Sequence, residues 1–208
     1  SSQSVVDASV QRTVTNYFVS NIGKFAQTFR RSNLLTEVDN TDPSVLSSRT
    51  DVLLQKRIIP VLTLPENQKF TFGSALKNPE ELTTPVVSTG FFKYQNQDVY
   101  IRNKLLDKFK VSGEGVVPVV FDRKPSNKLE MVNTKGVVVE DYMGYYEPLT
   151  GAVEILNLNV QSTNNQSNYI KVFGSPANES AIIPRFSGIL KYDASESSVN
   201  AVTVTSRV

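Results

Sequence analysis

The hydrophobic periodicity of the chain changes once, near residue 40, and this change constrains the fold more than any other feature. Over residues 6–29 apolar side chains recur every three to four positions, as one face of an amphipathic helix requires: Val6, Val10, Val14, Tyr17, Phe18, Ile22, Phe25 and Phe29. Gly23 is a candidate break, after which a second helix would continue toward Leu35. Residues 39–43 are turn formers, and Pro43 disfavours helical geometry at Asp42, so the helix must end before them.

After this turn the apolar residues fall at even spacings, and the remaining sequence predicts strands and turns. Residues 46–60 predict one long half-buried strand. Shorter strands are predicted at residues 69–72, 86–94, 99–102, 116–121, 136–141, 153–160, 169–173, 189–192 and 202–208. Hairpin turns are expected at residues 96–97, 112–115 and 148–151, where Gly151 can take a positive φ. The polar residues 161–168 predict a mobile loop or an excursion at a sheet edge.

These patterns predict an α+β fold, with an N-terminal helical segment followed by a mainly antiparallel β-rich region. No helix-sized crossover remains that could connect parallel strands. We expect residues 1–60 to hold the helical segment and the long strand, as an oligomerisation region, and residues 61–208 to form a β-rich structural domain.

The composition argues against most catalytic and nucleic-acid functions. The chain has no cysteine and no histidine, which removes thiolate chemistry and the commonest metal ligand and general base. The net charge of +2 is small and its basic residues are scattered, so nucleic acid is not an expected partner. No apolar run is long enough to span a membrane, and we expect a soluble, unsecreted protein. Because the chain opens on Ser1 without an initiator Met, we also expect a longer parent protein.

Two groups of aromatic residues are the candidate interaction sites. Tyr17, Phe18, Phe25 and Phe29 lie on the apolar helix face and serve as core or interface anchors, two roles that the sequence does not separate. The second group is Tyr142, Tyr145 and Tyr146, which adjoin Glu140, Asp141 and Glu147.

The second group admits three interpretations. A Tyr-rich hairpin is typical of a core or a protein interface, and this is the favoured interpretation. If the three rings are exposed together, they would form a stacking platform for a sugar or receptor. A carboxylate pair beside aromatic rings could also serve sugar hydrolysis, but neighbours such as Glu140 and Asp141 point to opposite faces of a strand. We therefore expect no catalytic residue, no metal ligand, no cofactor and no small-molecule substrate.

Several stretches together resemble the C-terminal region of the T4-like phage baseplate wedge protein that forms the inner ring, a relative of the baseplate J-like family. They are residues 40–50 (NTDPSVLSSRT), 54–57 (LQKR) and 87–94 (VSTGFFKY), and the hairpin formed by residues 136–139 with residues 145–155. Residues 161–208 share with that family only a general strand pattern.

The resemblance implies a structural protein of a contractile-tailed phage. Copies would pair and join wedges into a ring around the tail hub, beside other baseplate wedge proteins, and would rearrange when the sheath contracts. The chain would act in the virion, at the tail baseplate, after assembly in the host cytoplasm. The alternative is a carbohydrate- or receptor-binding β module of a tail fibre or adhesin, which would use the tyrosines of the second group.

Overall fold

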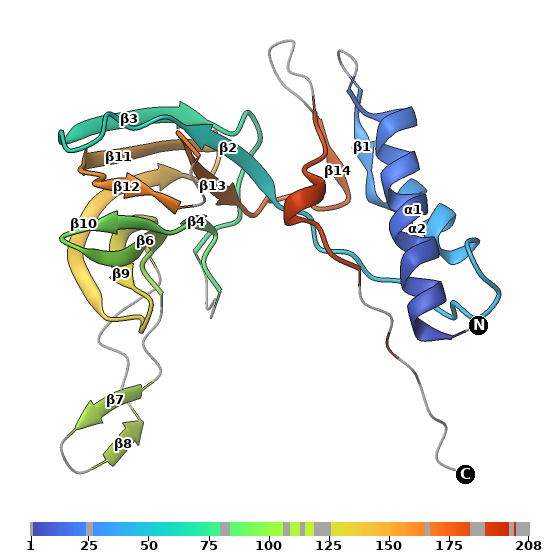
Figure 1. The fold of residues 1–208 in the computed structure, drawn as a ribbon, viewed down its shortest axis with the longest axis horizontal. Coiled ribbons are helices and arrows are strands. Elements are labelled where there is room, and N and C mark those ends of the chain that lie inside the picture. Colours follow the sequence, from blue (N-terminus) through green and yellow to red (C-terminus); the bar gives the residue numbers. More distant parts are fainter. Residues whose placement is uncertain are drawn as a thin grey trace. The chain divides into compact units, whose positions relative to one another are not determined.

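The computed structural model describes residues 2–23, 27–79, 84–105, 126–164, 167–183, 190–199 and 202 of the 208-residue chain, and the backbone of residues 109–112 and 115–118. Helices near the N-terminus are followed by a β-rich region whose described strand pairs are antiparallel, which confirms the predicted α+β class (Figure 1). The chain forms two compact units. The helical unit comprises residues 1–51 and 178–208, and the β-rich unit comprises residues 52–177. The expected domain boundary at residues 60–61 thus falls inside the second unit.

The helical unit combines two helices with a short two-stranded ribbon. Helix α1 spans Gln3–Asn21 and α2 spans Arg31–Asp39. Strand β1 (Phe29–Arg30) pairs with β14 (Ala181–Ile182), and a 3₁₀ turn, η2, spans Ala194–Glu196. The buried apolar residues of this unit come from all of these parts except η2: Val6, Val10, Tyr17, Ile22, Phe29, Leu34, Val38 and Ile182.

Two predictions for this part of the chain need correction. The helix does not reach Phe29, because α1 ends at Asn21 and Gly23 adopts a φ of +104°, which other residues avoid. Phe29 instead lies in β1, opposite Ile182, a partner that no local pattern could reveal. The long strand predicted over residues 46–60 is also wrong: only Leu54–Ile58 forms a strand, β2, because its partner strand covers only that stretch. Leu46 is 84 % exposed.

The β-rich unit is built on one ten-stranded sheet with the order β2-β13-β4-β6-β9-β10-β11-β3, while β5 and β12 pair beside β6. The strands are β3 (Glu66–Thr71), β4 (Val87–Thr89), β5 (Phe92–Tyr94), β6 (Gln97–Asn103), β9 (Lys128–Asn133), β10 (Val138–Glu147), β11 (Ala152–Leu158), β12 (Ser162–Thr163) and β13 (Ile170–Gly174). β7 (Phe109–Ser112) and β8 (Gly115–Pro118) form a separate hairpin. Within the polar residues 161–168, where a loop or an excursion at a sheet edge was predicted, Ser162 and Thr163 form β12 and pair with β5.

Turn chemistry fixes two hairpins, one at the predicted residues 148–151 and one at residues 95–96, one position before the predicted residues 96–97, because Gln97 already lies in β6. Gln95 and Asn96 both have positive φ between β5 and β6, as a two-residue hairpin turn with matching twist requires. Gly151 has a φ of +68° and donates its backbone N–H to the Glu147 carbonyl at 2.8 Å. A Cβ at Gly151 would lie 2.0 Å from the Ser74 carbonyl oxygen, so both conformation and space require glycine there.

Two strands were predicted near the C-terminus, at residues 189–192 and 202–208. Residues 190–192 have no regular secondary structure, so the strand predicted there is wrong over those residues. Position 189 and residues 203–208 lie outside the described part of the chain.

The core of the β-rich unit is one continuous cluster. Phe92, Leu129, Met131, Tyr146 and Leu158 are completely buried, and they come from four different strands. Burying a large apolar side chain contributes about 1.5–3 kcal/mol each. The sheet is therefore a rigid frame for the side chains on its outer surface.

Candidate assembly interface

In the helical unit the predicted aromatic residues form one stack. The Phe18 ring lies parallel to the Phe29 ring at 5.6 Å and to the Tyr192 ring at 4.4 Å, and Tyr17 meets Phe18 and Phe29 edge to face. Tyr17 and Phe29 are buried inside this unit. Burial, helped by the charge of Glu37, raises the pKa of Tyr17, so its hydroxyl stays neutral. Tyr17 and Phe29 are thus core residues of the helical unit.

The other members of the stack differ from the sequence prediction. Phe18 is only partly buried, and Phe25 lies outside the described residues. Tyr192 was not predicted as a member of the stack, because it lies far from Phe18 in the sequence and only the fold brings the two rings together.

The three tyrosines of β10 do not face the same way. Tyr146 is fully buried, donates its hydroxyl to the Lys77 carbonyl at 3.2 Å, and has its pKa raised by burial. Tyr142 and Tyr145 are 52 % and 40 % exposed. A platform of all three rings, which the sugar-binding interpretation needs, is therefore not formed.

Gly144 explains how β10 changes the direction of its side chains. The register of β10 against β9 shifts twice between Val138 and Gly144, and Gly144 takes a φ of +117°. A Cβ there would lie 2.0 Å from the Glu154 carbonyl oxygen. This irregularity places Tyr142 outward, and normal alternation after it sends Tyr145 outward and Tyr146 inward.

Polar side chains lie next to the exposed tyrosine Tyr145 of β10. Tyr145 donates its hydroxyl to Glu154 at 2.8 Å, and Glu154 lies 3.9 Å from Lys69 of β3. The hydrogen bond to Glu154 raises the pKa of Tyr145 and keeps it a donor. Val137, Val138 and Leu149 are further exposed apolar residues along β10 and its turns. Aromatic rings with a polar surround are the composition that protein interfaces favour.

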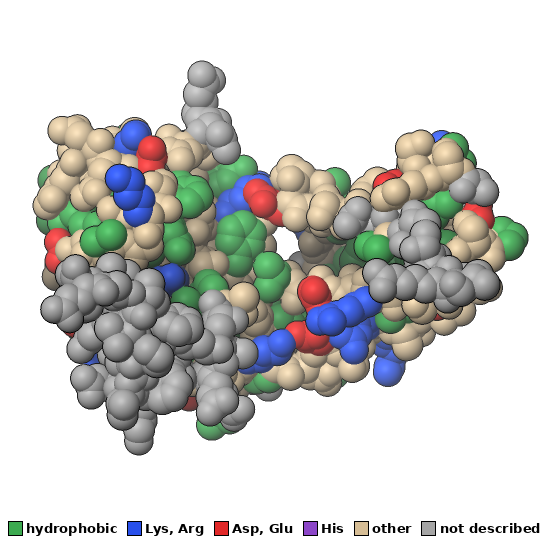
Figure 2. Space-filling model, turned by 90° about the horizontal axis from the view of Figure 1, so that it is seen from below, with side chains coloured by type: hydrophobic (Ala, Val, Ile, Leu, Met, Phe, Trp, Pro, Cys, Tyr) green, Lys and Arg blue, Asp and Glu red, His purple; other side chains and the backbone are tan. Residues whose placement is uncertain are grey.

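A second exposed apolar surface was not predicted from the sequence. Ile59, Val61, Leu62 and Leu64, called here the apolar segment, are each at least half exposed. Backbone bonds hold the segment in place: Thr63 donates to the Val160 carbonyl and Val61 to the Glu66 carboxylate, both at 2.8 Å. Figure 2 shows hydrophobic side chains at several places on the visible surface. Pro60 and Pro65 could have indicated that this segment is exposed, because two prolines that bracket an apolar run disfavour its inclusion in a sheet.

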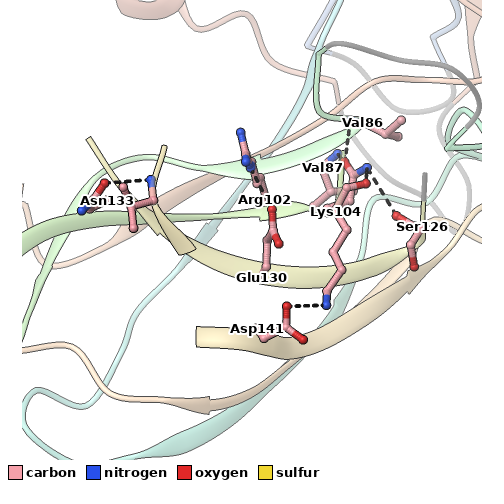
Figure 3. Close-up of polar contacts among 10 residues, drawn as sticks. Val86, Val87, Arg102, Lys104, Ser126, Glu130, Asn133 and Asp141 are labelled. Carbon is pink, nitrogen blue, oxygen red and sulfur yellow. Dashed lines mark hydrogen bonds and ion pairs between the residues drawn. The ribbon is translucent and has the colours of Figure 1, made fainter. Parts of the chain in front are cut away.

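A polar network fixes the centre of the sheet (Figure 3). Asn103, almost fully buried at the end of β6, accepts the backbone N–H groups of Val86 and Val87 at 2.7 and 3.0 Å. Its amide group donates to the carbonyls of Lys104 and Ser126. These bonds join three chain segments at one point, so the network supports the frame.

Two ion pairs complete the network. Arg102 pairs with buried Glu130 at 3.2 Å, and Lys104 pairs with Asp141 at 2.8 Å. Breaking the Arg102–Glu130 pair is expected to be costly, because the buried carboxylate would lose the guanidinium that compensates its charge.

The carboxylates once considered for catalysis have structural contacts. Glu140 accepts the Tyr94 hydroxyl at 2.9 Å, whereas Asp141 pairs with Lys104. Glu147 accepts the backbone N–H of Leu149 at 3.5 Å. Among the described residues no group of three or more metal-ligating side chains comes together, and none of the described helices is long and apolar enough to cross a membrane.

The fold and its surfaces define an α+β protein with exposed apolar and aromatic side chains on a large antiparallel sheet. Residues 1–57 match the family described as baseplate structural protein gp6, C-terminal domain III. The match includes α1, β1, α2 and most of β2, and it supports a structural role in a phage baseplate, within the tail of the virion and in association with other baseplate proteins. No curated protein matches the chain.

Proposed function

We propose that this chain is a baseplate wedge subunit of a contractile-tailed phage, which self-associates and joins wedges into a ring around the tail hub without catalysing a reaction. The observation that carries the proposal is the family match over residues 1–57. Its partners are further copies of the chain and other wedge proteins, and assembly takes place in the host cytoplasm. Neither nucleic acid, nor a membrane, nor a small molecule takes part.

Exposed apolar residues supply the contacts in this proposal. Within the matched region, Val5 and Val19 lie on the solvent side of α1, with Val19 76 % exposed. In the β-rich unit, Tyr142, Tyr145 and the apolar segment are exposed. A ring needs contacts that repeat from copy to copy, and separate surfaces on one chain can form two different contacts. We place self-association on α1 and the contacts with other wedge proteins on the β-rich unit.

Light scattering over a concentration series tests self-association through α1. The unmodified chain is expected to show a dimer or a larger species at micromolar concentration, and Val19→Asp is expected to weaken it about tenfold or more, because a charge would enter the apolar contact. Ser20→Asp is the matched control, since Ser20 is the exposed neighbour on the same helix and takes the same charge. A strict monomer, or equal weakening by both variants, would contradict the proposed contact.

A further inference from the structure

The C-terminal segment of the chain docks on the N-terminal helices. β14 pairs with β1, so that Ile182 lies opposite Phe29 and Ala181 opposite Arg30. The backbone N–H of Arg31 donates to the Ser180 carbonyl at 2.9 Å. The Arg31 side chain pairs with Glu179 at 3.1 Å, and both side chains are mostly buried. The backbone ribbon and the ion pair thus fix the start of α2 to residues 179–182.

Further along, the same segment contacts α1. The Tyr192 ring stacks on Phe18 at 4.4 Å with an interplanar angle of 3°, and Gln11 donates to the Tyr192 hydroxyl at 3.4 Å. Because Gln11 and Phe18 are seven residues apart, they lie on the same side of α1, two turns from each other. Residues 179–182 therefore touch the start of α2, and Tyr192 touches two turns of α1.

The two helices and β1 would form a poor domain without this segment. A two-residue strand cannot exist without its partner, and two short helices bury too little apolar surface for independent stability. Ile182, which is buried, comes from the C-terminal segment. The family match ends at residue 57, so it covers only the N-terminal part of this compact unit.

In the β-rich unit, in contrast, the segments at which the chain enters and leaves the unit lie side by side. Its first strand, β2, pairs with β13, one of its last, and the register sets Leu54 opposite Gly174. Directly opposed residues of antiparallel strands have Cα atoms about 4.5–5.5 Å apart. Adjacent ends are typical of a domain inserted into a loop of another domain. The unit also has its own continuous core.

We propose that the helical unit is a bipartite domain: residues 1–51 present a docking surface, made by Gln11, Phe18, Phe29 and Arg31, that residues 179–182 and Tyr192 of the same chain occupy. The β-rich unit is then a separately folding module inserted into this domain. The family match covers only the N-terminal part of this domain. A segment that lies beyond the match completes it. This inference concerns the fold of the units, so it stands apart from the proposed ring function.

Hydrogen exchange on the full chain tests the inference. Ile182→Asn places an amide in the buried position opposite Phe29, and it is expected to lower the protection of α1 and α2 amides by about tenfold or more, while β9–β11 keep theirs. Ile155→Asn is the matched control: Ile155 is equally buried in β11, and its replacement is expected to lower protection in β9–β11 and to leave α1 unchanged.

A milder variant covers the case in which Ile182→Asn does not fold. Tyr192→Ala removes one side of the stack on Phe18 and is expected to lower α1 protection by about threefold without any change in β9–β11. Unchanged protection of α1 in both variants would overturn the docking of residues 179–182 and Tyr192. An equal loss in both units would overturn the separate folding of the inserted module.

Discussion

The two units reach stability by different means, although each lacks cysteine and metal-ligand clusters in its described part. The β-rich unit has a large core supplied by neighbouring strands, most of which are joined by short turns. The helical unit has a small core that depends on a ribbon and an aromatic stack between chain segments more than 140 residues apart. Local sequence patterns therefore account for the β-rich unit, whereas contacts between distant chain segments complete the helical unit. Substitutions should therefore act within one unit.

The largest effect is expected at Gly144. Gly144→Ala forces a Cβ to within 2.0 Å of the Glu154 carbonyl oxygen at a positive φ, so the loss of stability should exceed about 4 kcal/mol. Chemical denaturation followed by tyrosine fluorescence measures it. Gly136→Ala is the control, since Gly136 also has a positive φ but open space around it, and its cost should stay near 1 kcal/mol. Similar losses in both variants would refute the steric explanation.

Arg102→Met is expected to cost about 3–5 kcal/mol, because it removes the guanidinium that compensates the charge of the buried Glu130 carboxylate. The unfolding free energy from urea titration gives the value. Lys93→Met removes the exposed pair with Asp98, which has a similar distance of 3.0 Å, and should cost less than about 1 kcal/mol. If the two costs were equal, burial would not be what makes the Arg102 pair important.

Tyr146→Phe should cost about 1 kcal/mol at neutral pH, since it removes only the hydrogen bond to the Lys77 carbonyl. The variant also changes the pH dependence. The pKa of Tyr146 is higher in the folded state than in the unfolded state, so its contribution is complete below about pH 10 and is lost as pH rises further.

Denaturation at a series of alkaline pH values tests this sign. Stability of the unmodified chain should fall above about pH 10, and Tyr146→Phe should reduce the slope. An unchanged slope would show that Tyr146 is not the group responsible.

The smallest effect concerns the helical unit. A double-mutant cycle of Phe18→Ala and Tyr192→Ala should give a coupling energy of about 0.5–1.5 kcal/mol, the usual value for a stacked pair. The helical circular dichroism signal follows the unfolding of this unit. A coupling energy of zero would mean that the stack does not connect the two chain segments.

How far the sequence predicts the structure follows from the same comparison. Local chemistry predicts the Gly151 turn, the antiparallel sheet and, one residue out of place, the turn at Gln95–Asn96, because turn conformation and strand alternation depend on neighbouring residues. It fails for Phe29, which resembles a helix residue in spacing but pairs with Ile182. The overlong strand at residues 46–60 fails for the same reason, since strand length is set by the partner.

The candidate interface is predicted in part. The sequence predicts a Tyr-rich hairpin at Tyr142, Tyr145 and Tyr146, but only Gly144 and the register shift of β10 decide which of these rings reach the surface. Tyr17 and Phe29 are core residues of the helical unit, a role that their spacing could not separate from an interface role. The apolar segment escaped prediction because apolar residues between strands are usually buried.

The central claim, that this chain is a structural subunit of a phage baseplate, is tested most directly by quantitative mass spectrometry of baseplates purified from the phage that encodes it. We expect the chain to be present in a fixed ratio to the other baseplate proteins and to stay bound through purification. Absence from purified baseplates, with the protein found only free in the infected cell, would contradict it.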